Sequence, residues 1–400
     1  MMSDALDSAC IGPFDHQPRT RLVFGEGTLD RLGELTRELG GRRVLIVTDA
    51  GIVKAGHVER ARSSLEAAGL TTAVFDAVRE NPTTLDVARC VAALREHSTD
   101  TIVGLGGGSS MDTAKGGNFL FTNGGEMRDY WGVGKATRPM LPLIAVPTTA
   151  GTGSECQCAA LIADEQTHQK MACLDPKAAA RVALLDPTLT VSQPPRVTAC
   201  TGLDAITHAV ETAVTRRRNP ISAMYSREAF RRLVAAFPRV LAAPGDLPAR
   251  AGMQLGAAFA GTAIENSMLG AAHSCANPLT ARFDLTHGHA VAVMLPHVIR
   301  FNAAGDATAS AIYAELSRAA GLVSADVPEA AAVSALAETI ERFLVGAGFA
   351  RTLEASGVER ARLPALAAEA ARQWTAQFNP RPVTEADFAA LFAAAYEGGG

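Results

Sequence analysis

The sequence predicts two domains of different class: an α/β domain over residues 1–194 and an all-α domain over residues 195–400. Up to about residue 190, short β-rich runs alternate with amphipathic helical stretches, as βαβ units around a mostly parallel sheet do. After Pro194-Pro195, helical patterns rich in Ala, Leu and Arg dominate, and no convincing strand follows. The length of 400 residues accommodates two or three domains of roughly 150 residues each.

The first half reads as alternating strands and helices. Helical patterns cover residues 57–70 and 84–97. Strand patterns are RVLIVTD (43–49), TTAVFDAV (71–78), DTIVGLGGGSS (100–110, a strand and then a loop), PLIAVPTT (142–149) and RVALLDP (181–187). In the second half, we expect breaks between helices near Pro220, Pro244, Pro248 and Pro278, because proline disrupts a helix interior.

Composition excludes several classes of protein. The net charge of −4 gives no basis for a nucleic-acid or anionic-membrane partner. No signal-peptide pattern opens the chain, and no run of about 18 uncharged apolar residues suggests a membrane span. Seven scattered cysteines, an odd number, fit reduced thiols in a cytoplasmic protein better than a disulfide framework.

A glycine loop, VGLGGGSSMDTAK (103–115), follows the third strand pattern and precedes a helix. Gly107, Gly108 and Ser109 let backbone N–H groups approach a phosphate at a helix N-terminus. The loop is neither the G-x-G-x-x-G fingerprint nor a Walker A loop, which ends in G-K-[ST]. A tight turn needing glycine only for its geometry is the alternative, but three glycines followed by Ser109 and Asp112 favour phosphate binding.

Two further segments complete a candidate nucleotide site. Asp49 closes the first strand, where a carboxylate can bind ribose hydroxyls and repel a 2′-phosphate, so we expect NAD rather than NADP. A helix N-cap is the simpler reading of this aspartate. PTTAGTGSE (147–155) brings hydroxyls and small residues to a loop after another strand, although a Gly/Thr-rich turn would look the same.

A candidate metal site lies in the second half. TGLDAITHAVE (201–211) places Asp204 and His208 four residues apart, on one face of a helix. His273 and His287 can add two nitrogens, and one oxygen with three nitrogens suits Zn²⁺ or Fe²⁺. The spacing does not prove that these segments converge, because each histidine could equally be an ordinary core or surface residue.

These motifs together resemble the iron-containing (group III) alcohol dehydrogenase family over nearly the whole chain. Residues 183–211 and 270–302 are similar to its two signatures, while GGGSSMDTAK, PTTAGTGSE and ENPT (80–83) are similar to its cofactor segments. The resemblance implies an N-terminal nucleotide-binding α/β domain and an all-helical C-terminal domain, the dehydroquinate synthase-like fold. It implies the metal ligands Asp204, His208, His273 and His287. It implies cofactor contacts from Asp49, Asn81, Gly107, Gly108, Ser109, Thr148, Thr152 and Lys170.

Asn277 is a departure, because many members of this family carry a histidine there that is suspected of relaying protons. An amide forms hydrogen bonds but does not titrate near neutral pH, so we expect Asn277 to orient substrate or water. His289, two residues after His287, points to another helix face and is a weaker candidate for the relay. Ile264 corresponds by family position to a pocket wall.

The resemblance implies a metal-dependent NAD(P)-linked alcohol dehydrogenase or aldehyde reductase acting on a small alcohol or aldehyde. We expect NAD(H) in preference to NADP(H), one divalent metal, Fe²⁺ or alternatively Zn²⁺, and a homodimer or higher homo-oligomer. Two alternatives stay open. One is a superfamily relative with an acidic or phosphorylated substrate, such as a maleylacetate reductase or a cyclase. The other is a redox-dead nucleotide-binding or assembly protein.

Overall fold

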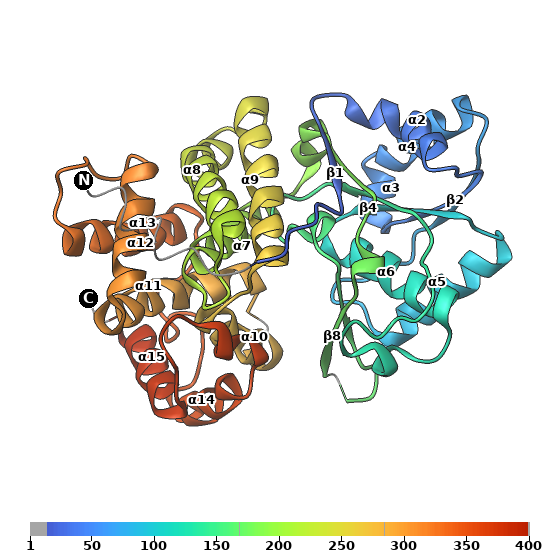
Figure 1. Ribbon diagram of the computed structural model, residues 1–400. Coiled ribbons are helices and arrows are strands. Elements are labelled where there is room, and N and C mark those ends of the chain that lie inside the picture. The colour runs from blue at the N-terminus through green and yellow to red at the C-terminus, as the bar shows by residue number, and fades with distance from the viewer. Residues whose placement is uncertain (1–13, 168, 284, 399–400) are drawn as a thin grey trace. The chain divides into compact units, whose positions relative to one another are not determined.

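The computed structural model describes residues 14–167, 169–283 and 285–398. Its described residues divide into two compact units, one over residues 17–193 and one that combines residues 194–398 with residues 14–16 (Figure 1). His16 belongs to the second unit through its Nδ1 atom, which lies 2.8 Å from Oδ1 of Asn266. Among the described residues, no helix is both long enough and apolar enough to cross a membrane.

The α/β unit is built on a six-stranded sheet in which every recorded pairing is parallel. The strand order is β1-β9-β6-β4-β2-β3. The strands are β1 (Arg21–Phe24), β2 (Arg43–Val47), β3 (Thr71–Phe75), β4 (Thr101–Gly106), β6 (Leu143–Pro147) and β9 (Val182–Leu185). The chain leaves β2 for β3 on one side and then returns to β4 on the other, so the β2/β4 boundary is the switch point where ligands bind in such sheets.

Helices cover both faces of this sheet because its strands are apolar on both sides. On one face, Val44 and Ile46 pack with residues of α2 (Leu32–Glu38) and α4 (His57–Ala67). On the other face, Leu45 and Val47 pack with residues of α5 (Thr84–Glu96) and α6 (Gly108–Asn123). The near-continuous hydrophobic runs of the sequence thus correspond to strands buried on both faces.

Several boundaries differ from the predictions. The first two strands end at Val47 and Phe75, before the ends of the predicted segments 43–49 and 71–78. The sequence analysis also missed a small sheet of order β5-β8-β7, formed by β5 (Gly132–Val133), β7 (Ala159–Ala163) and β8 (Lys170–Leu174). β5 has only two residues, and β7 (AALIA) and β8 (KMACL) contain few of the β-branched and aromatic residues that mark strands.

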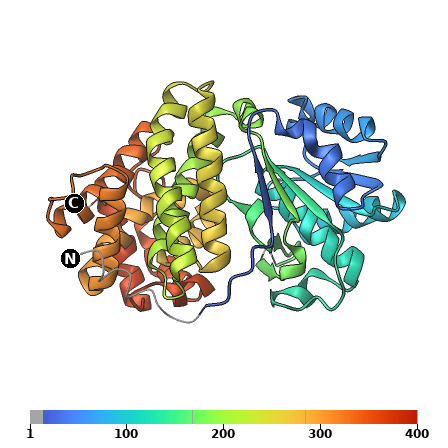
Figure 2. The same cartoon turned by 45° about the horizontal axis from the view of Figure 1, so that its top comes forward.

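The second unit contains helices and no strand among its described residues from Pro195 to Glu397. The helices that carry the candidate site are α7 (Pro195–Val214), α10 (Ala271–Phe283) and α11 (His287–Gly305). The other helices are α8 (Pro220–Ala242), α9 (Leu247–Asn266), α12 (Ala307–Ala319), α13 (Glu329–Gly346), α14 (Leu363–Ala371) and α15 (Glu385–Glu397). Helices α8 and α9 lie side by side in both views (Figures 1 and 2).

Proline lies at the start of several helices in this unit. Pro195, Pro220 and Pro248 occupy the first turns of α7, α8 and α9, where the missing N–H has no intrahelical partner to lose. The break expected near Pro278 is wrong, because α10 continues through this residue. Pro278 has no backbone N–H, so α10 lacks one intrahelical hydrogen bond there. Cys275, Pro278 and Leu279 are all buried, and this tertiary packing keeps the segment helical.

Candidate functional site

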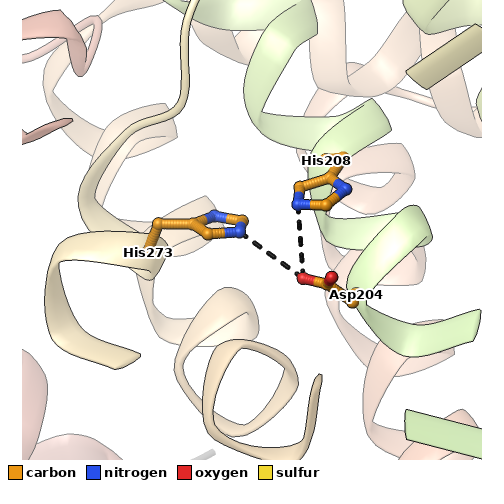
Figure 3. Close-up of side chains that lie close together, drawn as sticks. All are labelled: Asp204, His208 and His273. Carbon is orange, nitrogen blue, oxygen red and sulfur yellow. Dashed lines mark ion pairs between the residues drawn. The ribbon is translucent and has the colours of Figure 1, made fainter. Parts of the chain in front are cut away.

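The candidate metal centre begins on α7, where Asp204 and His208 lie one helical turn apart. Nε2 of His208 is 3.3 Å from Oδ1 of Asp204, and both side chains are buried. Figure 3 shows His208 and Asp204 projecting from the same helix toward each other. The four-residue spacing in the sequence therefore produces the expected common face.

Helix α10 brings His273 to the same carboxylate oxygen. Nε2 of His273 lies 3.5 Å from Oδ1 of Asp204 (Figure 3). The rings of His208 and His273 are stacked, with centroids 4.9 Å apart. One ligand atom from each of Asp204, His208 and His273 lies within 4.8 Å of the other two. Two segments about 65 residues apart in sequence thus converge on one oxygen.

His287, the first residue of α11, approaches this oxygen from a third helix. Its Nε2 atom is 3.9 Å from Oδ1 of Asp204, and its ring centroid is 5.4 Å from that of His273. Its side chain keeps 36% of its surface exposed, whereas the other three are nearly inaccessible. The three predicted histidine ligands therefore lie around one oxygen of the fourth, Asp204, with His208 and His273 buried and His287 at the open side.

The donor set fits a divalent ion. Oδ1 of Asp204 and Nε2 of His273 are buried, and neither has a hydrogen-bond partner among the described residues. Such orphaned atoms are costly unless something else satisfies them. Ligands about 2.1 Å from a tetrahedral ion lie roughly 3.4 Å from one another. Distances of 3.3, 3.5 and 3.9 Å from Oδ1 of Asp204 to the three imidazoles are close to that spacing.

The electrostatics of the cluster keep the aspartate ionised. Burial raises the pKa of Asp204, but His208, His273 and His287 together hold it well below its ordinary value. Burial lowers the pKa of His273, but Glu211 and Asp204 outweigh this and raise it to about 9. The cluster is thus a site where positive charge is favoured beside Oδ1 of Asp204.

Glu211 is a residue of this site that the sequence analysis missed. It lies on α7, seven residues after Asp204, and is buried. Its Oε2 atom is 2.5 Å from Nδ1 of His273, and its Oε1 atom accepts a hydrogen bond of 2.7 Å from the backbone N of Ala272. The spacing that links Asp204 to His208 also puts Glu211 near the same helix face, which is the signal that could have identified it.

Asn277 lies one turn after His273 on α10 and is half-buried. Its Nδ2 atom donates a hydrogen bond of 2.9 Å to Oε1 of Gln373, a residue that sequence reasoning did not single out. This bond fixes the orientation of the amide.

His289 and Ile264 occupy buried positions. Nε2 of His289 forms a 2.9 Å hydrogen bond with the carbonyl oxygen of Ala350, and its ring stacks on Phe349. These contacts hold the His289 ring, and its weaker candidacy for the proton relay stays a prediction. Ile264 lies near the end of α9 and is 6% exposed. Its assignment as a pocket wall stays a prediction.

In the α/β unit, three predicted cofactor segments follow the adjacent strands β2, β4 and β6 and therefore share one edge of the sheet. Asp49 caps α3 (Ala50–Lys54), with Oδ1 accepting from the backbone N of Gly51 and Ile52. Gly106 has a φ of 149° and joins β4 to α6. A Cβ atom on Gly106 would lie 2.4 Å from Oγ of Ser110 and 3.5 Å from Oδ2 of Asp49. The second Asp49 oxygen thus faces the glycine loop.

The other loops close around the start of α6. The backbone N of Thr148 donates to the carbonyl oxygen of Gly106 at 2.9 Å. A Cβ atom on Gly108 would lie 2.8 Å from Cγ2 of Thr152, so only glycine allows this close approach. Gly107 is the N-cap of α6, and Gly108 and Ser109 form its first turn. Their amide groups lie at the helix end where anions bind.

Lys115 anchors the same loop from inside the unit. Its Nζ atom donates to the carbonyl oxygens of Ser154 and Ala159 and to Oγ of Ser154, at 2.6, 3.0 and 2.9 Å. Oγ of Ser154 in turn donates to Oδ1 of Asp112 at 3.1 Å. Burial raises the pKa of Asp112 to about 6, although the charges of Lys115 and Lys170 lower it. This network holds the 148–154 loop against α6.

Two of the predicted cofactor-binding residues, Asn81 and Lys170, are not joined to the glycine loop by any of these contacts. Asn81 is exposed in the turn before α5 and has a φ of 52°, a conformation that asparagine tolerates better than most residues. Lys170 is the exposed first residue of β8. Among the described residues, no recorded hydrogen bond joins either side chain to the glycine loop, so their cofactor roles stay predictions.

Known proteins resemble the chain over both units. Residues 18–187 match the family model described as iron-containing alcohol dehydrogenase, and residues 198–396 match that of the C-terminal part of the Fe-containing alcohol dehydrogenase family. A 1,3-propanediol dehydrogenase of Klebsiella pneumoniae is 34% identical over 96% of this chain and 99% of its own length. An NAD-dependent methanol dehydrogenase of Bacillus methanolicus is 34% identical over 92% and 96%. The crystal structure of a 1,3-propanediol oxidoreductase superposes with a TM-score of 0.92 at 32% identity, covering 96% of this chain and 100% of that one.

Proposed function

Because the chain belongs to the iron-containing alcohol dehydrogenase family and is an alcohol or aldehyde oxidoreductase, we propose that it is metal-dependent and transfers a hydride between NAD(H) and a small substrate. The observation that carries this proposal is the convergence of three imidazoles on Oδ1 of Asp204. Asp204, His208, His273 and His287 would hold one divalent ion, Fe²⁺ or alternatively Zn²⁺. A bound ion supplies Lewis acidity that lowers the pKa of an alcohol hydroxyl or polarises an aldehyde carbonyl.

The remaining work falls to residues of the two units. Asp204, His208 and His273 are buried, and the more exposed His287 marks the open side of the ligand set. Asn277, held by Gln373, offers an amide that can orient a substrate hydroxyl or a water but cannot take up a proton. A proton would therefore leave through water or cofactor hydroxyls.

The proposed cofactor is NAD(H). The amide groups at the start of α6 would bind the pyrophosphate, and the glycines there allow close approach. Oδ1 of Asp49 caps α3, and Oδ2 lies on the side of Gly106, where it can bind a ribose hydroxyl and would repel a 2′-phosphate. The N-cap role and the cofactor role of Asp49 are thus compatible, because they use different oxygens.

The test is elemental analysis of the purified chain, followed by NADH oxidation with a panel of small aldehydes, hydroxyaldehydes and ketones. We expect one metal ion per chain, and loss of most of it in His273→Ala. His297→Gln, which changes another buried histidine of the helical unit, is the matched control and should retain the metal. Unchanged metal content in His273→Ala would overturn the ligand assignment, and a wild-type preference for NADPH would overturn the cofactor assignment.

The proposal also includes a cytoplasmic location, which rests on the reduced-cysteine pattern, and a homodimer or higher homo-oligomer, which rests on the family resemblance. Light scattering of the purified chain measures the second. A monomer at micromolar concentration would contradict it.

A further inference from the structure

We propose that Glu211 is a positioning residue that fixes His273 in its metal-binding tautomer and orientation and thereby sets the affinity of the site. This inference rests on the proposed metal-dependent function. It assigns a role to a buried carboxylate that is not itself among the four proposed ligands.

The first step concerns the histidine ring. Oε2 of Glu211 is 2.5 Å from Nδ1 of His273, and the two side chains are 4% and 5% exposed. A carboxylate can only accept here, so Nδ1 carries the proton. Nε2 is then the atom available as a ligand, and it is the atom that lies 3.5 Å from Oδ1 of Asp204. Partners of this kind orient metal-binding histidines in many proteins.

The second step concerns the helix that carries His273. The first amide groups of a helix lack intrahelical partners, and two side chains from other segments supply them at the start of α10. Oε1 of Glu211 accepts from the backbone N of Ala272 at 2.7 Å, and Oδ1 of Asn379 accepts from that of Ala271 at 3.3 Å. A Cβ atom on Gly270 would lie 3.2 Å from the Glu211 oxygen and 3.0 Å from the Asn379 oxygen, so a glycine leaves room for both.

Glu211 therefore binds α10 twice with one carboxylate, once at the backbone and once at the ligand ring. Because Glu211 lies on α7 with Asp204 and His208, it ties His273 to the helix that carries those two ligands. Asn379 also anchors the start of α10, but within the described part of the chain it has no recorded contact with His273. This difference separates anchoring of the helix from orientation of the ring.

The chemistry of the side chain predicts which variants fail. Both donors, the Ala272 amide and Nδ1–H of His273, need an acceptor. A carboxylate offers two oxygens, whereas an amide offers one oxygen and one NH₂ group. In Glu211→Gln the NH₂ group must face one of the two donors, so one contact is lost at nearly unchanged volume. In Glu211→Asp the shorter side chain cannot maintain both contacts.

The experiment measures Zn²⁺ affinity of the full-length apo chain by competition with a chromophoric chelator, and the visible spectrum of the Co²⁺-loaded chain. Loss of such a partner typically weakens metal binding about 10–100-fold. We expect this loss in Glu211→Gln and Glu211→Asp, together with an altered Co²⁺ spectrum, while circular dichroism and cooperative thermal unfolding remain. Asn379→Ala is the matched control. It should stay within about twofold of wild type, as an independent site does.

Three outcomes contradict the proposal. If both Glu211 variants bind Zn²⁺ as wild type does and keep its Co²⁺ spectrum, Glu211 does not position His273. If Asn379→Ala weakens binding as much as Glu211→Gln, only anchoring of α10 matters. If the wild-type chain binds no Zn²⁺ through Asp204, the proposed metal-dependent function fails as well. The first two outcomes leave that function intact, so the two kinds of failure can be told apart.

Discussion

At the scale of single residues, Asn277 is an amide that cannot take up a proton near neutral pH, so we predict that it orients the substrate or a water instead. Asn277 lies one turn after the proposed ligand His273, and its side-chain amide is held by a hydrogen bond to Oε1 of Gln373. If it only orients substrate, Asn277→Ala should keep the metal content and reduce turnover about 2–10-fold, the effect of one hydrogen bond of roughly 0.5–1.5 kcal/mol. Elemental analysis and steady-state kinetics measure the two effects. Release of the metal would place Asn277 in the coordination shell.

Replacing the same residue by a titratable one extends the test. Asn277→His should add an ionisation near the ordinary imidazole pKa of about 6.5 to the pH–rate profile, with hydride transfer shown to limit the rate. His289→Gln should leave the wild-type profile unchanged, because His289 is bound to the carbonyl oxygen of Ala350. A wild-type ionisation in this range that disappears in His289→Gln would instead identify His289 as the relay.

At the scale of elements, the loop after β6 depends on a buried lysine of α6. Lys115→Met should lower the free energy of unfolding of the α/β unit by about 2–4 kcal/mol, because it leaves the carbonyl oxygens of Ser154 and Ala159 without their charged donor. It should also weaken NADH binding, because the 148–154 loop loses its anchor. Urea denaturation and NADH fluorescence titration measure the two effects. Lys54→Met, at an exposed lysine, should change neither, and an equal effect in both variants would refute the anchoring role.

The sequence predicted the elements whose pattern lies within one short segment, and it did not predict contacts between distant segments. The hydrophobic segments 43–49 and 100–110 predicted strands, which the structure has at Arg43–Val47 and Thr101–Gly106, and the Asp204–His208 spacing predicted a shared helix face. The meeting of α7, α10 and α11 was not predictable from spacing, because it is set by tertiary packing. The spacing of Glu211 from Asp204 could have placed it near the ligand face of α7, but its role depends on the contact with His273, which the sequence does not show.

At the scale of the whole molecule, acid stability depends on histidines that are buried without a charge. Burial and the Arg300 charge lower the pKa of His297 from 6.5 to about 4, against the opposing charge of Glu341. Between these values the unfolded chain binds a proton that the folded chain does not. Stability from this residue therefore rises with pH across the window and is lost as pH falls from about 6.5 to about 4, by at most roughly 3 kcal/mol.

Burial of a carboxylate acts in the opposite direction in the α/β unit. Burial raises the pKa of Glu155 from 4.5 to about 7, despite the nearby charge of Lys115. The folded chain binds this proton more tightly, so the contribution of Glu155 is present at low pH and is lost as pH rises through about 7. The pH dependence of the whole chain's stability therefore sums contributions of opposite sign from the two units. The contribution of one histidine has to be measured by comparing variants.

His297→Gln isolates it, because glutamine is neutral at every pH in the window and of similar size. The two tryptophans, Trp131 and Trp374, lie in different units, so a Trp131→Phe background makes fluorescence report on the helical unit. We expect the stability advantage of the wild-type histidine over the His297→Gln variant to be smaller at about pH 5 than at about pH 7.5, by roughly 2 kcal/mol in urea denaturation. A difference that does not change with pH would mean that His297 titrates alike in the folded and unfolded chains, and the acid sensitivity of the helical unit would then have to arise from other groups.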